Sequence, residues 1–200
     1  MIGLRANLTT FDMAFSPITD HGSRITRPSS HPLVLLAAEA VDAFVRDRRI
    51  IAPPEDLLSR HPPAARRAGA FVCLKASGLL RGCIGTTEPT RETLAMEIIE
   101  NAVAAATRDP RFDPVSVDEL AELAITVDVL SEPERIADHM QLDHLRYGVI
   151  VRAGARHGVL LPDIEHINSV HEQLATVRQK AGIGPDEVIQ LFRFEVTRYR

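Results

Sequence analysis

The segment 80–85, with the sequence Leu-Arg-Gly-Cys-Ile-Gly, holds the residues of this chain that are best suited to do chemistry. We call it the hexapeptide. Cys83 is a candidate thiolate nucleophile, and Arg81, two positions earlier on the same face of a strand, is a cation that would stabilise a thiolate or bind an anion. Gly82 and Gly85 weaken a strand, so they predict a close backbone approach to a ligand or to another part of the protein.

Cys83 also has a structural interpretation. Free cysteine is among the most buried residue types, and its small side chain packs well beside glycines. The other cysteine, Cys73, falls on the preceding predicted strand, so the two thiols are expected near one another, although the sequence does not fix their register. Both interpretations, nucleophile and packed core residue, stay open.

Three further residues are candidates for the same site. Glu88 follows the hexapeptide and is either an acid or base or a loop carboxylate near a helix start. Asp109 and Arg111 either form a turn with a surface ion pair or, together with Arg81, bind an anionic or carboxylate-bearing ligand. The catalytic hypothesis requires Arg81, Cys83, Glu88 and Arg111 to converge on one accessible cleft.

The histidines provide neither a metal site nor an evident general base. His139 and His144, and likewise His166 and His171, are five residues apart, which does not match the helical spacing of a zincin site. His157 is expected in a hairpin turn, exposed to solvent. No glycine-rich phosphate loop is present, so the sequence predicts no metal and no cofactor.

Composition narrows the class of protein. The chain has 200 residues, 45% of them hydrophobic, and a net charge of −4, so it predicts a globular protein with no general attraction to nucleic acid. Two cysteines and the lack of a cleavable signal predict a cytoplasmic protein. No apolar run is long enough to cross a membrane, so no membrane role is expected.

The pattern of apolar residues predicts an α+β fold with mainly antiparallel sheet and packed helices. Residues 1–30 lack periodicity and are expected to be an extension ahead of a domain at 31–200, either loosely ordered or reaching toward a neighbouring subunit. Helices are expected at 32–48 with Ser30 as cap, 90–107 with Thr90 as cap, 117–122, and 167–181 ending at Gly182. Strands are expected at 71–76, 79–85, 125–129, 148–152, 158–161 and 189–196, and 53–69 is expected to be a connecting loop with at most a short helix.

Several motifs together resemble the AMMECR1 domain family. They are the hexapeptide, the tetrapeptide Asp109-Pro110-Arg111-Phe112, Tyr147-Gly148, the segment 158–162 and Lys180-Ala181-Gly182, in matching order across most of the chain. The resemblance implies two unequal lobes. It also implies an association with a Memo-type protein and a radical S-adenosylmethionine protein, the grouping that gives the name AmmeMemoRadiSam system protein A.

Two functional hypotheses follow from the residues and the resemblance. In the first, the protein is part of an enzyme system in which Cys83 acts as a nucleophile on a small organic substrate. In the second, it is a non-catalytic binding or adaptor module whose hexapeptide strand shapes a groove.

The segment 163–171 departs from the family pattern, with Asp163 in place of the usual glutamine and no tryptophan in the chain. The ligand or partner of this protein is therefore expected to differ from that of its relatives.

Overall fold

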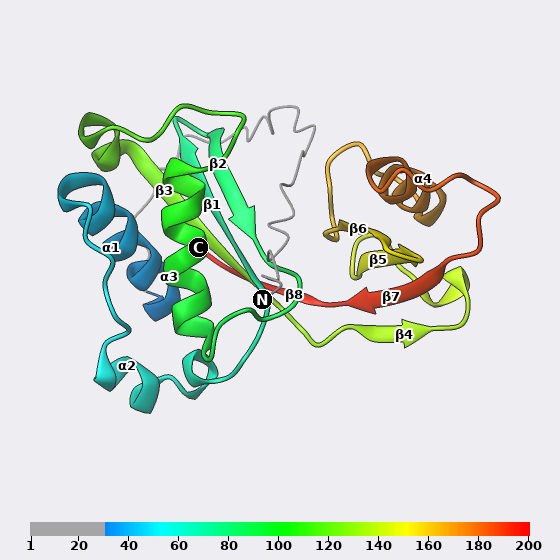
Figure 1. The fold of residues 1–200 in the computed structure, drawn as a ribbon, viewed down its shortest axis with the longest axis horizontal. Coiled ribbons are helices and arrows are strands. Elements are labelled where there is room, and N and C mark those ends of the chain that lie inside the picture. The colour runs from blue at the N-terminus through cyan, green and yellow to red at the C-terminus, as the bar shows by residue number, and fades with distance from the viewer. Residues whose placement is uncertain (1–30) are drawn as a thin grey trace, which may run out of the picture. The chain divides into compact units, whose positions relative to one another are not determined.

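The computed structural model describes residues 31–200, so the predicted extension at 1–30 lies outside the described residues. The helices are α1 (Pro32–Asp47), α2 (Glu55–Arg60), α3 (Leu94–Thr107) and α4 (Val170–Lys180), with 3₁₀ turns η1 (Pro62–Ala65), η2 (Val117–Glu122) and η3 (His139–Gln141). The strands are β1 (Ala70–Ala76), β2 (Leu79–Gly85), β3 (Leu123–Leu130), β4 (Glu134–Ile136), β5 (Gly148–Ala153), β6 (Arg156–Leu160), β7 (Gln190–Phe194) and β8 (Val196–Tyr199). The fold is α+β, as the sequence predicts (Figure 1).

Two compact units of unequal size make up the described chain. The larger unit holds residues 31–127 and 199–200, and the smaller holds residues 128–198. The strands form two sheets, in the orders β2-β1-β3-β8 and β4-β7-β5-β6. The pairs β1–β2, β4–β7, β5–β6 and β5–β7 are antiparallel. Two unequal lobes and antiparallel pairing are therefore confirmed.

The β1–β2 hairpin positions the hexapeptide. Its turn is formed by Ser77 and Gly78, which both have positive φ, at 50° and 82°. Positive φ at both central residues matches the right-handed twist of the flanking strands, which is why this turn closes a two-residue hairpin. The hexapeptide lies on β2, at the edge of its sheet.

Helix α3 lies against β1 and β2, and α1 packs beside α3 (Figure 1). Both helices are rich in small apolar side chains at helical spacing, and these are buried. The alanines of α3 leave room for the helix backbone to approach the sheet closely. The core of the larger unit therefore forms between these two helices and the β1–β2 face.

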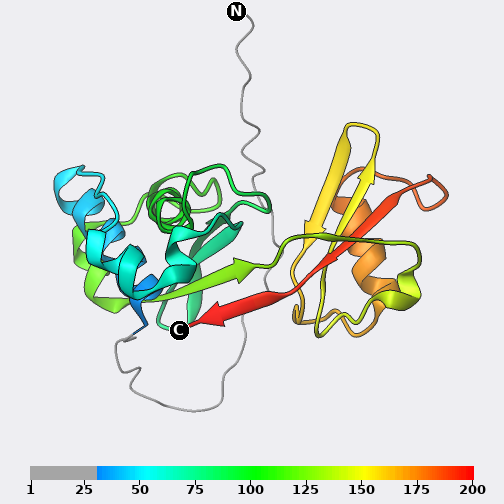
Figure 2. The same cartoon turned by 90° about the horizontal axis from the view of Figure 1, so that it is seen from below.

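In the smaller unit, α4 packs on one face of the second sheet (Figure 2). Alternate residues of β5, such as Val149 and Val151, point toward this helix and join Leu160 and Val177 in a buried cluster. Gly182 follows α4 with a φ of 63°, in the left-handed conformation that commonly ends a helix. The predicted end of this helix is therefore confirmed.

Several predicted boundaries are wrong. Helix α3 starts later than expected, because Thr93 and not Thr90 is its N-cap and accepts a hydrogen bond from the Met96 N–H at 3.2 Å. Helix α1 is capped by His31, whereas the predicted cap at Ser30 lies outside the described residues. The connecting loop predicted at 53–69 holds the one short helix that was allowed for, α2, and in addition the 3₁₀ turn η1.

The remaining differences lie in the strands. His157 lies in β6, opposite Arg152, because the hairpin turns tightly at residues 154–155; it is nevertheless exposed, as expected. The segment predicted as one strand at 189–196 is two strands, β7 and β8, in different sheets. The short strand β4 was not predicted, since three residues are too few to show a period. No helix within residues 31–200 is long and apolar enough to cross a membrane.

Candidate functional site

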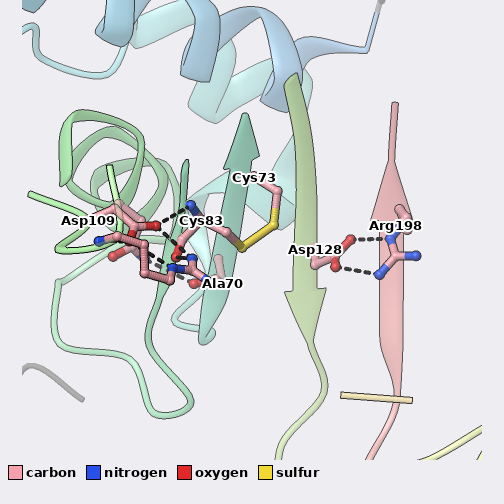
Figure 3. The surroundings of a disulfide bond; sticks show 8 residues. Ala70, Cys73, Cys83, Asp109, Asp128 and Arg198 are labelled. Atoms are coloured by element: carbon pink, nitrogen blue, oxygen red, sulfur yellow. Dashed lines mark hydrogen bonds and ion pairs between the residues drawn. A yellow bond between two sulfur atoms is a disulfide. The ribbon is translucent and has the colours of Figure 1, made fainter. Parts of the chain in front are cut away.

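Cys83 lies directly opposite Cys73 on the paired strands β1 and β2, and the two sulfurs form a disulfide (Figure 3). Their Cα atoms are 4.1 Å apart, a separation typical of a non-hydrogen-bonded pair in antiparallel sheet, in which side chains lie closest. Cys83 is fully buried, whereas Cys73 is partly exposed. The register that the sequence left undetermined therefore brings the two sulfurs together.

The outer edge of β2 at Cys83 is covered by Asp109 and Arg111. The Cys83 N–H donates to Asp109 Oδ2 at 2.8 Å (Figure 3), and the Cys83 carbonyl accepts from Arg111 Nη2 at 3.4 Å. Asp109 is buried and also accepts from the Arg111 side chain, at 2.7 Å from Nη2 and 2.9 Å from Nε. The two residues thus satisfy the backbone groups that an edge strand otherwise leaves unpaired.

Arg81 occupies a bulge in β2. The register shifts at this point, so that Leu74 faces Gly82 and Lys75 faces Leu80, and Arg81 has no partner on β1. Its guanidinium instead forms a bidentate pair with Glu119, at 2.6 and 3.1 Å, and donates to the Asp113 carbonyl at 2.9 Å. Arg81 was predicted to share a face with Cys83 because side chains alternate along a strand. The bulge interrupts that alternation between the two residues.

Arg81 and Arg111 are brought together around the ring of Phe112. Their guanidinium carbons lie 6.0 and 5.5 Å from the ring centroid, within the range of cation–π attraction. The structure therefore unites the tetrapeptide with the hexapeptide, as the anion-site hypothesis requires. Each guanidinium, however, has a carboxylate of the same chain as its partner.

Both carboxylates in this cluster have a lowered pKa. Burial alone would raise the pKa of Asp109, but the hydrogen bonds from Arg111 and from the Cys83 N–H outweigh it, so the pKa lies below its ordinary value. The hydrogen bonds from Arg81 and from the Ser116 N–H lower the pKa of Glu119 to about 2. Both groups are therefore ionised at neutral pH and act as acceptors, and neither is suited to be a general acid.

Gly82 and Gly85 approach protein atoms closely. A Cβ atom added at Gly82 would overlap the carbonyl oxygen of Ala105 in α3, and one added at Gly85 would overlap the ring of Phe71 in β1. The close approach that the two glycines predict is therefore found, and the neighbours are a helix and a strand of the same unit. The contacts of Gly82 and Gly85 with Ala105 and Phe71 do not by themselves support the ligand-binding role expected for the two glycines.

Glu88 lies in the loop 86–91 that follows the hexapeptide, and it is exposed. A buried carboxylate, Glu97 of α3, fastens this loop. Glu97 accepts from the Thr86 hydroxyl at 2.5 Å, the Thr90 N–H at 2.8 Å and the Arg91 N–H at 2.8 Å. This explains why Thr90 does not cap α3: its N–H and hydroxyl bind the helix side chain.

Sequence reasoning missed Glu97, and also Asn101, whose amide donates to the Ala70 carbonyl at 3.0 Å. The available signal was their position, because both polar residues fall on the apolar face of the predicted helix. A polar residue on such a face needs a hydrogen-bond partner. No group of three or more histidine, cysteine, aspartate or glutamate side chains arranged to hold a metal ion is found within residues 31–200.

The fold and the hexapeptide define a class of α+β protein with two antiparallel sheets and a cysteine motif on an edge strand. The family model described as AMMECR1 matches residues 34–200, and the chain belongs to this family. A protein of Thermotoga maritima is 49% identical over 176 residues, which cover 85% of this chain and 98% of the relative. A protein of Clostridium acetobutylicum is 42% identical over 84% of this chain, which spans only 36% of that relative.

A solved structure supports the assignment. The crystal structure of an uncharacterised protein from Pyrococcus horikoshii matches with a TM-score of 0.75 and 32% sequence identity, covering 83% of this chain and 88% of that one. The fold is therefore shared with that protein. The names of these relatives state no activity.

Proposed function

We propose that this protein is a binding module of the AMMECR1 family that recognises a partner protein through the loop 86–91. The observation that carries the proposal is the attachment of this loop to Glu97, a carboxylate with only 2% of its surface exposed. A buried carboxylate that accepts several hydrogen bonds holds a loop in one conformation. Loops fixed in this way on a rigid scaffold commonly carry recognition.

The contacts of the hexapeptide favour binding over catalysis. The Cys83 sulfur is bonded to Cys73, and no hydrogen bond within the described residues reaches it. Arg81 is paired with Glu119 in a bidentate geometry. The hexapeptide therefore acts as a rigid support from which the chain runs directly into the loop 86–91.

The resemblance to the AMMECR1 domain family implies which proteins are the partners. We expect the loop to contact a Memo-type protein, with a radical S-adenosylmethionine protein in the same system. Glu88 is exposed at the centre of the loop, so a partner that contacts the loop is expected to meet this side chain. We also propose a cytoplasmic location, which the low cysteine count supports.

The test is a calorimetric titration of the full chain with the purified Memo-type protein of the same organism. Glu88→Lys reverses the charge at this position and is expected to weaken binding by about tenfold or more. Cys83→Ala and Glu39→Gln, an exposed carboxylate on α1, are expected to leave it unchanged. The proposal is wrong if the wild type does not bind, or if Cys83→Ala abolishes binding while Glu88→Lys does not affect it.

The catalytic hypothesis is a second candidate, favoured by the Arg111 guanidinium beside the Cys83 backbone. A cation close to a cysteine favours its thiolate, and Arg111, which also pairs with Asp109, contacts the Cys83 carbonyl. Reduction of the disulfide would then release a candidate nucleophile for a small organic substrate. In that case Cys83→Ala should abolish the activity of the partner system while leaving the fold nearly intact, and Glu88→Gln should reduce it.

A further inference from the structure

The two cysteines face each other because of the backbone, not because of flexible side chains. They are ten residues apart in sequence, on strands joined by a two-residue turn. The Cys83 N–H and carbonyl point away from β1, toward Asp109 and Arg111, which makes Cys73 and Cys83 a non-hydrogen-bonded pair. The hairpin register therefore holds the two sulfurs together whether they are oxidised or reduced.

The two sulfurs differ in access. Cys83 has no exposed surface, and its strand edge is covered by the buried Asp109. Cys73 lies on the neighbouring strand and is partly exposed. Thiol–disulfide exchange requires an incoming thiolate to reach one sulfur of the bond, so exchange from solvent is directed to Cys73.

We propose that Cys73 and Cys83 form a reversible thiol–disulfide site whose exchange partner is a low-molecular-weight thiol, with Cys73 as the sulfur that is attacked. This site lies beyond the proposed binding function and does not depend on the loop 86–91.

The chemistry of the site is balanced by two molecules of the small thiol. The first, as a thiolate, attacks Cys73 Sγ, forms a mixed disulfide there and releases Cys83 as a thiolate, which takes up a proton. The second attacks the small-molecule sulfur of the mixed disulfide and releases Cys73 as a thiolate. The protein disulfide is reduced to two thiols, while two thiols are oxidised to one small-molecule disulfide. Oxidation by the small-molecule disulfide is the reverse.

The test equilibrates the full chain in buffers of reduced and oxidised glutathione. Acid stops exchange, free thiols are alkylated in denaturant, and intact mass gives the state of both cysteines. The wild type is expected to pass from two alkylated thiols to none as the buffer becomes oxidising, without gaining glutathione. A wild type that keeps two alkylated thiols in every buffer would overturn the proposal.

Single-cysteine variants test which sulfur is attacked. Cys83→Ala is expected to gain one glutathione on Cys73. Cys73→Ala should react at Cys83 at a rate at least about tenfold lower. In urea both variants should react at similar rates, so the difference measured in buffer belongs to the fold. Circular dichroism in buffer establishes that both variants are folded. Equal rates in folded variants would contradict the assignment of Cys73.

Discussion

Asp109 links two motifs that are 26 residues apart through a single carboxylate. It accepts the Cys83 N–H in a buried hydrogen bond and pairs with Arg111 in a partly buried one. Removing one partner of a buried ion pair leaves the other charge and a backbone donor unsatisfied.

We therefore expect Asp109→Ala to lower the free energy of unfolding by about 3 kcal/mol. Urea unfolding at neutral pH measures this loss. Asp118→Ala, which removes an exposed carboxylate from η2, is the control and should change the unfolding free energy much less. A loss at Asp109 no larger than that of the control would show that this carboxylate does not hold β2.

Helix α3 and strand β2 approach each other closely at Gly82, so a substitution at this residue tests their packing. The added methyl group of Gly82→Ala would overlap the Ala105 carbonyl, a backbone atom that cannot rotate away. We expect a loss of about 2–3 kcal/mol in the free energy of unfolding, from the cost of overpacking.

The matched control is Gly184→Ala. Its methyl group would lie 3.3 Å from Glu187 Oε1, the end of a flexible side chain, so a change below about 1 kcal/mol is expected. Thermal unfolding of both variants gives the comparison. Equal losses would mean that α3 does not approach β2 as closely as described.

The loop 86–91 depends on α3 through Glu97. The N–H groups of Thr90 and Arg91 both donate to Oε2 of Glu97, and the Thr86 and Thr90 hydroxyls donate to Oε1. Glu97→Gln replaces the charged acceptor by a neutral amide, which weakens the charge-assisted bonds from the two N–H groups. Hydrogen–deuterium exchange should become faster at these two amides and stay unchanged in β1. Unchanged exchange in the loop would show that Glu97 does not fasten it.

At the scale of elements, hydrophobic period and turn chemistry predicted most of the fold from sequence. The two hairpin strands on either side of Ser77-Gly78 and the helical turn at 117–122 depend on neighbouring residues only, and both were predicted correctly. The start of α3 was not, because Thr90 and Thr93 are equally good caps and the choice depends on Glu97. A hydrogen bond from the loop to a side chain in the first turn of the helix does not follow from hydrophobic periodicity, so the sequence did not predict it.

The candidate site shows the same limit. Arg81, Asp109 and Arg111 were identified from their types and motifs, and the structure brings them together near Cys83. Their partners were not predictable: the bulge that frees Arg81 from the β1 pairing and the register that joins Cys73 to Cys83 both depend on strand pairing.

At the scale of the larger unit, His31 at the start of α1 stacks on Tyr199 near the end of the chain, with ring centroids 3.9 Å apart. His61 meets His31 edge-on at 5.3 Å. Burial, together with the charge of His61, lowers the pKa of His31 below 6.5. The folded state therefore favours neutral His31, while the unfolded chain binds the proton more readily.

This difference predicts a pH dependence of stability. The contribution of neutral His31 is complete above pH 6.5 and is lost as the pH falls through the pKa of the folded state. His31→Asn keeps an N-cap acceptor without the titration, so its unfolding free energy should change less between about pH 7.5 and pH 5.5 than that of the wild type. Equal slopes in urea unfolding at these pH values would contradict the prediction.

We propose that the hexapeptide is a structural support and that Cys83 does not act as a nucleophile on a substrate. The most direct measurement is the rate at which iodoacetamide alkylates Cys83 in the folded Cys73→Ala variant between about pH 6 and pH 8, beside a free thiol. We predict a rate below that of the free thiol at every pH. A faster rate with an inflection at low pH would contradict the claim and restore the catalytic hypothesis.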